Sequence, residues 1–193
     1  MKPVIRNLLA VALVAAAADA AAGDGHRYIP VNLVTQEHSN WCWAGVAVSV
    51  LNRYNQSPSQ CSVVNWAFGI SHACGNSTFN WNNYANSPNG IYGGGGSIQG
   101  ILNHWGVRSY GIQNYLRWST VVTEVNANRP FVMRYGWTGG GGHFIVGYGY
   151  NDTSGTQRVA YMNPWPGEGY TWVNYQWAVR ASDHAWTHTL RMN

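Results

Sequence analysis

The sequence has little charge and almost no lysine. Charged residues make up 9% of its 193 residues, against about 25% in an average soluble protein, and the only lysine is Lys2. No basic run is present that could follow a phosphate backbone, so we expect no nucleic-acid partner. Long apolar runs are missing as well. The run at residues 8–18 is shorter than the ~20 residues that cross a bilayer, so we expect no membrane span.

The first 22 residues have the order of a secretory signal peptide. Lys2 and Arg6 precede the apolar run, and small residues follow it at 18–22. We therefore expect residues 1–22 to be removed on export, to the periplasm or the medium. Residues 23–193 then fold as one domain, which we take to be a monomer. Disorder is excluded, because 11 Trp, 12 Tyr and 4 Phe supply ample apolar area.

Three cysteines remain after the signal, which is an odd number for an oxidising compartment. Cys61 and Cys74 lie 13 residues apart, and we expect them to form a disulfide that leaves Cys42 as the free thiol. The alternative is zinc held by Cys61, His72 and Cys74. That spacing matches no common zinc site, so we expect no metal.

The periodicity changes from helical to strand-like about halfway along the chain. Apolar residues at helical spacing predict a helix from Cys42 to Tyr54, which Ser39 or Asn40 can cap. Further helices are predicted at 97–106 and 119–128, and strands at 107–112, 131–135, 143–150, 158–163 and 170–177. Helices followed by a mostly antiparallel sheet indicate an α+β protein of two lobes, with a ligand site in the cleft between them.

Four residues form a candidate set for nucleophilic catalysis. Cys42 begins the first helix, where unpaired N–H groups favour a thiolate. His143 follows four glycines and opens a strand, where it can exchange the proton. Asn163 can orient the imidazole, and Gln36 can donate to an oxyanion. Each residue alone is more often structural, so only the combination carries the prediction.

The segments around these residues resemble the papain-like cysteine peptidases. Residues 36–44, 142–149 and 163–165 are similar to that family's nucleophile, histidine and Asn-x-Trp motifs, in the same order. The resemblance implies an active site of Cys42, His143, Asn163 and Gln36 in a two-lobed fold, with a helical N-terminal lobe and a β C-terminal lobe. It also implies that Gly95, Gly96, Gly142 and Trp165 contact substrate. The short length and Trp41-Cys42-Trp43 resemble staphopain-like and bacterial avirulence-effector peptidases.

The resemblance implies a secreted cysteine endopeptidase. Such an enzyme acts on protein or peptide substrates through a thioester acyl-enzyme and takes no cofactor. Two alternatives stay open, because a fold does not fix a substrate. One is another acyl transfer on the same fold, by a peptidoglycan amidase, a transglutaminase or an isopeptidase. The other is a non-catalytic, aromatic-rich secreted binding protein, whose cysteine would react with a thiol-directed epoxide no faster than a free thiol.

Overall fold

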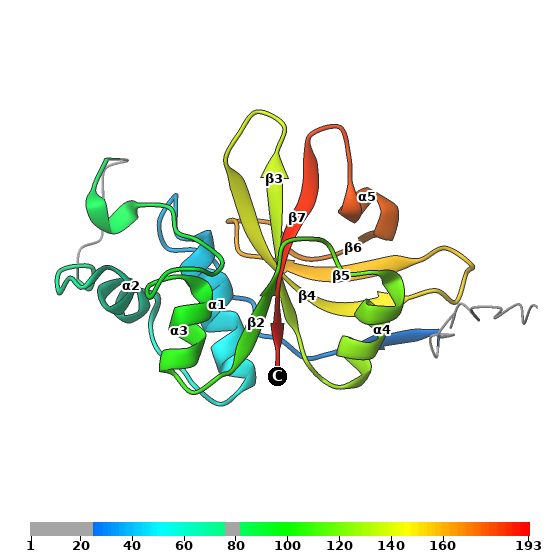
Figure 1. Cartoon of the computed structure of the whole chain (residues 1–193), viewed down its shortest axis with the longest axis horizontal. Coiled ribbons are helices and arrows are strands. Elements are labelled where there is room, and N and C mark those ends of the chain that lie inside the picture. The colour runs from blue at the N-terminus through cyan, green and yellow to red at the C-terminus, as the bar shows by residue number, and fades with distance from the viewer. Residues whose placement is uncertain (1–24, 76–81) are drawn as a thin grey trace, which may run out of the picture.

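The chain folds into a seven-stranded antiparallel sheet with helices at two sides (Figure 1). A computed structural model gives this fold and describes residues 25–75 and 82–193. The signal sequence predicted at 1–22 lies outside the described residues. Within those ranges, no helix is both long and apolar enough to cross a bilayer.

The strands follow an order in the sheet that differs from their order in the chain. Neighbours run β2 (Ser109–Ile112), β7 (His184–Met192), β3 (Phe131–Trp137), β4 (Gly142–Asn151), β5 (Arg158–Asn163) and β6 (Gly169–Asn174), and β1 (His26–Tyr28) pairs with β4. The predicted hairpin at 143–163 is confirmed, since β4 and β5 pair directly. β7, which no pattern predicted, lies between β2 and β3.

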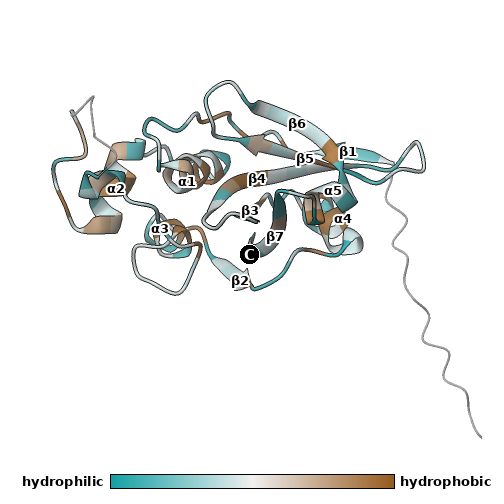
Figure 2. Ribbon diagram, turned by 90° about the horizontal axis from the view of Figure 1, so that it is seen from above, coloured by the Kyte–Doolittle hydropathy of each residue, from teal (hydrophilic) through white to brown (hydrophobic). Residues whose placement is uncertain are grey.

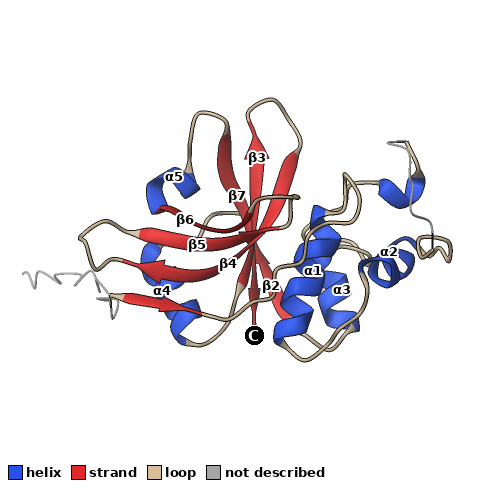
Figure 3. Ribbon diagram, turned by 180° about the vertical axis from the view of Figure 1, so that it is seen from behind, coloured by secondary structure: helices blue, strands red, loops and turns tan. Residues whose placement is uncertain are grey.

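The helices fall into two groups. α1 (Cys42–Arg53), α2 (Gln60–Phe68) and α3 (Ile98–His104) form a lobe beside the sheet. α4 (Trp118–Asn126) and α5 (Tyr175–Val179) lie on the side of the sheet away from α1 (Figures 2 and 3). This arrangement confirms the predicted α+β class. The order along the chain is more mixed than predicted, since β1 precedes α1, β2 precedes α4, and α5 lies between β6 and β7.

Helix α1 is buried around its whole circumference, not along one apolar stripe. Residues 43–51 are all buried, because α1 packs against β4 on one side and against α2 and α3 on the other. Small side chains permit the close approach. A Cβ atom at Gly45 would lie 3.1 Å from Cβ of Pro164, and the Ser49 hydroxyl donates to the Asn32 carbonyl at 2.7 Å. Thus α1 sits at the centre of the molecule, with its first residue fixed by packing on several sides.

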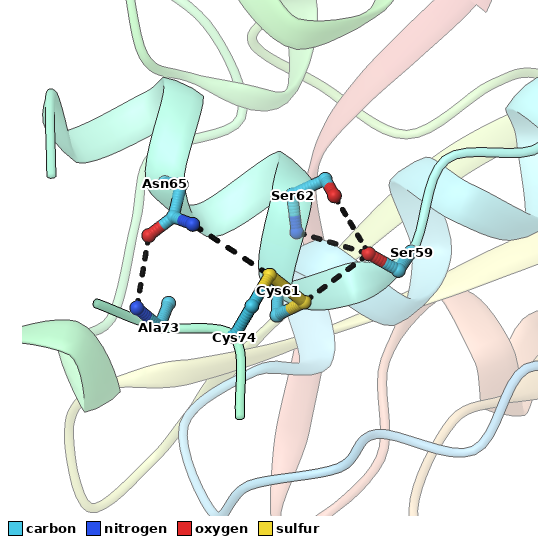
Figure 4. Close-up of a disulfide and its surroundings, with 6 residues drawn as sticks. All are labelled: Ser59, Cys61, Ser62, Asn65, Ala73 and Cys74. Atoms are coloured by element: carbon cyan, nitrogen blue, oxygen red, sulfur yellow. Dashed lines mark hydrogen bonds between the residues drawn. A yellow bond between two sulfur atoms is a disulfide. The ribbon is translucent and has the colours of Figure 1, made fainter. Parts of the chain in front are cut away.

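A disulfide joins α2 to the loop that follows it (Figure 4). Cys61 and Cys74 are bonded, which confirms the predicted pair and leaves Cys42 free. Neither bonded sulfur is then available as a ligand for the zinc site that was the alternative. The Ser59 hydroxyl caps α2 by accepting from the Ser62 N–H at 3.2 Å. Asn65 accepts from the Ala73 N–H at 2.9 Å. Its Nδ2 group also donates to the Cys74 sulfur at 3.6 Å, so the loop is held to α2 by the disulfide and by hydrogen bonds of Asn65 (Figure 4).

Replacing Cys61 and Cys74 together by serine is expected to lower the free energy of unfolding by about 3 kcal/mol, because the unfolded chain regains the entropy of an open loop. Urea unfolding monitored by tryptophan fluorescence measures this loss, with Cys42→Ser as the matched control that breaks no disulfide. A titration that finds three thiols in the folded, unreduced protein would contradict the bridge.

Candidate active site

Two buried tryptophans fix the position of Cys42 at the start of α1. Trp41 and Trp43 are fully buried, and their indole N–H groups donate to the carbonyls of Ala85 at 2.7 Å and Ser87 at 3.1 Å. The predicted cap by Ser39 or Asn40 is wrong. Trp41 is the N-cap residue, and no described side chain bonds the helix start. The amides of the first turn are therefore not occupied by a capping side chain.

The Cys42 thiol is only partly exposed, and its surroundings act on its pKa in two directions. Burial is the largest effect and raises the pKa of Cys42. The backbone N–H groups of Phe144, Trp43 and Cys42 itself act against burial, and so does the charge of Arg134. Burial prevails. The resting thiol is therefore neutral, which differs from the thiolate that the helix position had suggested.

His143 opens β4 and is held by Asn163, the last residue of β5. Its Nε2 atom donates to Oδ1 of Asn163 at 2.7 Å, and the same oxygen accepts from the Trp165 N–H at 3.0 Å. In the neutral ring, Nδ1 is then the nitrogen that can accept a proton. Burial lowers the pKa of His143 to about 4, although the bond to Asn163 acts against it. The imidazole is therefore neutral at ordinary pH.

The His143–Asn163 pair lies beneath a layer of indoles. The ring of Trp165 stacks on His143 with centroids 4.2 Å apart, and Trp137 is nearly parallel to both rings. His143 is 2% exposed and Asn163 9% exposed. A hydrogen bond kept from water in this way is electrostatically stronger than an exposed one, so the imidazole is well oriented.

Three segments far apart in the sequence meet at this site. Cys42, at the start of α1, lines one pocket with Gly142 and Phe144, the two chain neighbours of His143. The Gln36 N–H donates to the Pro164 carbonyl at 2.8 Å, and Pro164 packs on α1 at Gly45. The structure thus bonds His143 to Asn163 and places the start of α1 beside the start of β4.

The Gln36 side chain is present at the site in an unexpected orientation. Its Nε2 group donates to the carbonyls of His38 at 2.8 Å and Ser39 at 2.9 Å. Its Oε1 atom is buried and bonds no described residue. Both amide hydrogens are therefore already bound to carbonyls, and an oxyanion can receive one only if the side chain turns.

A pocket of about 140 Å³ adjoins the thiol. It is lined by Cys42, Trp43, Pro88, Asn89, Arg134, Gly141, Gly142 and Phe144. The predicted contact residue Gly142 lies on it, and Trp165 lies on two neighbouring pockets, one of which it shares with Gln36.

Gly95 and Gly96 do not line this pocket, contrary to the expectation from the family motif. A Cβ atom at Gly96 would lie 2.1 Å from the Ala67 carbonyl oxygen, and the Gly96 carbonyl accepts from Asn89 Nδ2 at 2.8 Å. Gly95 is exposed. The lack of a side chain at Gly96 therefore admits the backbone of α2, and Pro88 and Asn89 are the residues of this region that lie on the pocket beside Cys42.

Arg134 is a site residue that the sequence analysis missed. It projects from β3 and is held by hydrogen bonds to the Thr187 hydroxyl and the Gly141 carbonyl, both at 3.0 Å. A lone arginine within an apolar strand gave no signal in the sequence. Among the described residues that line the pocket beside Cys42, it is the only charged one.

Comparison with known proteins gives a family and a shared fold. The model of a family described as Peptidase_C39 like matches residues 28–191. A double glycine motif protease from an AMS/PCAT transporter, crystallised with the leader peptide, is 14% identical with a TM-score of 0.51, over 86% of this chain and 97% of that one. The peptidase domain of Streptococcus ComA, a bi-functional ABC transporter involved in a quorum sensing pathway, is also 14% identical, with a TM-score of 0.54, over 86% and 96%. Such identities show a shared fold. No curated protein matches this chain.

Proposed function

Because this chain belongs to the Peptidase_C39-like family of cysteine peptidases, we propose that it is a secreted endopeptidase that uses Cys42, His143 and Asn163 as its catalytic triad. One observation carries the proposal. The buried Asn163–His143 hydrogen bond lies next to a thiol that shares its pocket with Gly142 and Phe144, the residues on either side of His143. An oriented imidazole near a thiol is what a histidine-activated cysteine needs, so this placement supports the proposal.

The reaction begins with a neutral pair. As the Cys42 sulfur attacks the substrate carbonyl carbon, its proton passes to Nδ1 of His143. Asn163 holds the ring through Nε2 and favours the imidazolium that forms. The new oxyanion lies near the amide N–H of Cys42 at the helix start. Gln36 adds a second donor when its side chain releases one of its two carbonyls.

His143 then acts as an acid and afterwards as a base. It protonates the amine as the C–N bond breaks, which leaves a thioester on Cys42. It next removes a proton from water, which attacks the thioester, and the proton returns to the sulfur. The cycle consists of proton transfers and acyl transfer, and nothing is oxidised or reduced. The proposed cycle therefore requires no metal or cofactor.

Changing Asn163 to alanine is expected to lower kcat/KM by about 10²-fold, a smaller loss than removal of the nucleophile, because it disturbs the orientation of His143 and leaves the reacting atoms in place. Asn163→Asp, which keeps an acceptor oxygen, should retain most of the activity. Initial rates on one fluorogenic peptide compare the two variants. If both variants lose activity as completely as Cys42→Ala does, Asn163 has a role beyond orientation.

The substrate is proposed to be a peptide or a protein. The double glycine motif protease was crystallised with a leader peptide, which supports a peptide as the substrate. Cleavage of a peptide library by residues 23–193, with and without reductant, tests the proposal. Cell-wall peptides and glutaminyl acceptors assayed in parallel separate it from amidase and transglutaminase activity.

Two further points belong to the same proposal: the chain is exported, and it is more closely related to some cysteine peptidases than to others. Secretion rests on the order of residues in 1–22. A closer relation to staphopain-like and avirulence-effector peptidases rests on chain length and on Trp41-Cys42-Trp43. We take the exported domain to act as a monomer.

A further inference from the structure

A second pocket lies beside His143 and Asn163 and shares no lining residue with the pocket that Cys42 lines. Its volume is about 140 Å³, and His143 and Asn163 line it while Cys42 does not. Buried Tyr135 and His184 contribute to its lining, together with the exposed residues Trp165, Glu168, Trp177 and Asp183. Of the residues that line this pocket, the proposed mechanism uses only His143 and Asn163, on which Trp165 packs.

Two deeply buried polar atoms on this pocket have no hydrogen-bond partner among the described residues. They are Oη of Tyr135 and Nε2 of His184, whose residues are 4% and 2% exposed. His184 uses its other nitrogen, Nδ1, to donate to the Asp183 carboxylate at 2.9 Å. In the neutral ring, Nε2 is therefore an acceptor. Buried polar atoms left unpaired are costly. A ligand with N–H groups can donate to Nε2 of His184 and to a lone pair of the Tyr135 hydroxyl, which is itself also a donor.

The exposed residues of the pocket favour a positive charge. Trp165 and Trp177 are 40% and 43% exposed, and indole faces attract cations. Glu168 and Asp183 add two carboxylates, and the described residues that line the pocket include no lysine or arginine. Burial is the largest cause of the raised pKa of Tyr135, and Tyr161 and Asp183 raise it further.

Other occupants fit this pocket less well. An anion would meet Glu168 and Asp183, and an apolar group would leave the acceptors of Tyr135 and His184 unpaired. In the described part of the chain, no three side chains of the metal-binding types are grouped closely enough to hold an ion. An organic cation with N–H donors satisfies both the charge and the hydrogen bonds.

We propose that this pocket binds the ammonium or guanidinium group of a lysine or arginine side chain on the amine side of the scissile bond. The placement relative to that bond rests on the proposed function. His143 protonates the departing amine, so the pocket that His143 and Trp165 line receives the residues after the cleavage point. The acyl side of the substrate occupies the separate pocket beside Cys42.

Binding of small cations tests the pocket without any use of catalysis. The native protein is titrated with n-butylamine and n-butylguanidine as probes, and with n-butanol as the uncharged control, by calorimetry. Both cations are expected to saturate one site and butanol is not. The double variant Glu168→Gln and Asp183→Asn should bind the cations about 10-fold more weakly, a change of about 1.4 kcal/mol. Asp152→Asn, in the distant β4–β5 loop, should bind as the native protein does. Equal binding of butanol, or unchanged binding by the double variant, would overturn the proposal.

Cleavage of matched peptides tests the placement. Two peptides differ only in lysine or norleucine immediately after the scissile bond, and the lysine peptide is expected to have a kcat/KM about 10-fold higher. The double variant should lose most of this preference. If no peptide is cleaved but the cations bind, the proposed function fails and the pocket stands. If peptides are cleaved and the cations do not bind, the pocket assignment fails. Binding without any lysine preference overturns the assignment to a substrate side chain.

Discussion

Replacing Cys42 with alanine is expected to reduce kcat/KM by about 10⁵-fold or more, because the attacking atom is removed and no neighbour can replace it. Cys61 and Cys74 are bonded to each other, so no other described cysteine is free. The fold should be kept. Alanine is the best helix former, and the buried contacts at this helix start are made by Trp41 and Trp43.

Peptide cleavage and thermal unfolding of the purified domain measure these two expectations together. Asn52→Ala, at the other end of α1, is the matched control and should retain native rates. Substantial turnover by a folded Cys42→Ala protein would remove Cys42 from the mechanism. Loss of activity accompanied by unfolding would be resolved with Cys42→Ser, which keeps a side chain of similar size.

Replacing His143 with asparagine is expected to lower kcat/KM by about 10⁴-fold or more at neutral pH, because the thiol then has no base to receive its proton. Burial lowers the pKa of His143 to about 4. In the native enzyme the imidazole is therefore neutral and can accept a proton above about pH 4. As the pH falls through that value the ring becomes protonated, and kcat/KM should fall with it.

The pH dependence distinguishes a base from a merely structural histidine. In His143→Asn the residual reaction needs a thiolate that forms without help. Because burial raises the pKa of Cys42, the residual rate should increase with alkaline pH, and the acid limb near pH 4 should be absent. A variant that keeps the native pH profile at a uniformly lower rate would show that His143 acts through the structure alone.

The sequence predicted those elements whose pattern is local. Helix α1 and the β4–β5 hairpin follow from apolar periodicity and from a turn-rich loop, and both were found close to their expected bounds. β7 was missed because His184–Met192 does not alternate: residues 185 and 186 are both apolar and residues 187–189 are all polar, and the pairing with β3 shifts register there. Its central position depends on two distant neighbours. The strand predicted at 170–177 ends early because the Asn174 side chain accepts from the N–H groups of Gln176 and Trp177 and starts α5.

The site residues that could be predicted are those that lie within a local sequence motif. Cys42, His143 and Asn163 occur within recognisable motifs. In the structure His143 bonds Asn163, and Cys42 lines a pocket with the chain neighbours of His143. Arg134, Tyr135 and His184 have no such motif, because only the pairing of β3 with β4 and β7 places them beside the triad. Gly95 and Gly96 show the opposite case. Their motif suggested a wall for substrate, whereas in the structure the Gly96 backbone packs against α2.

The central claim is that His143 activates the Cys42 sulfur toward an electrophile. It is tested most directly by reacting the native domain and His143→Asn with a thiol-reactive epoxide and locating the label by peptide mass spectrometry. The account predicts one label on Cys42 of the native protein, formed about 10²-fold or more faster than with free cysteine and with the His143→Asn variant. Labelling of the native protein no faster than free cysteine, or equally fast labelling of His143→Asn, would contradict it.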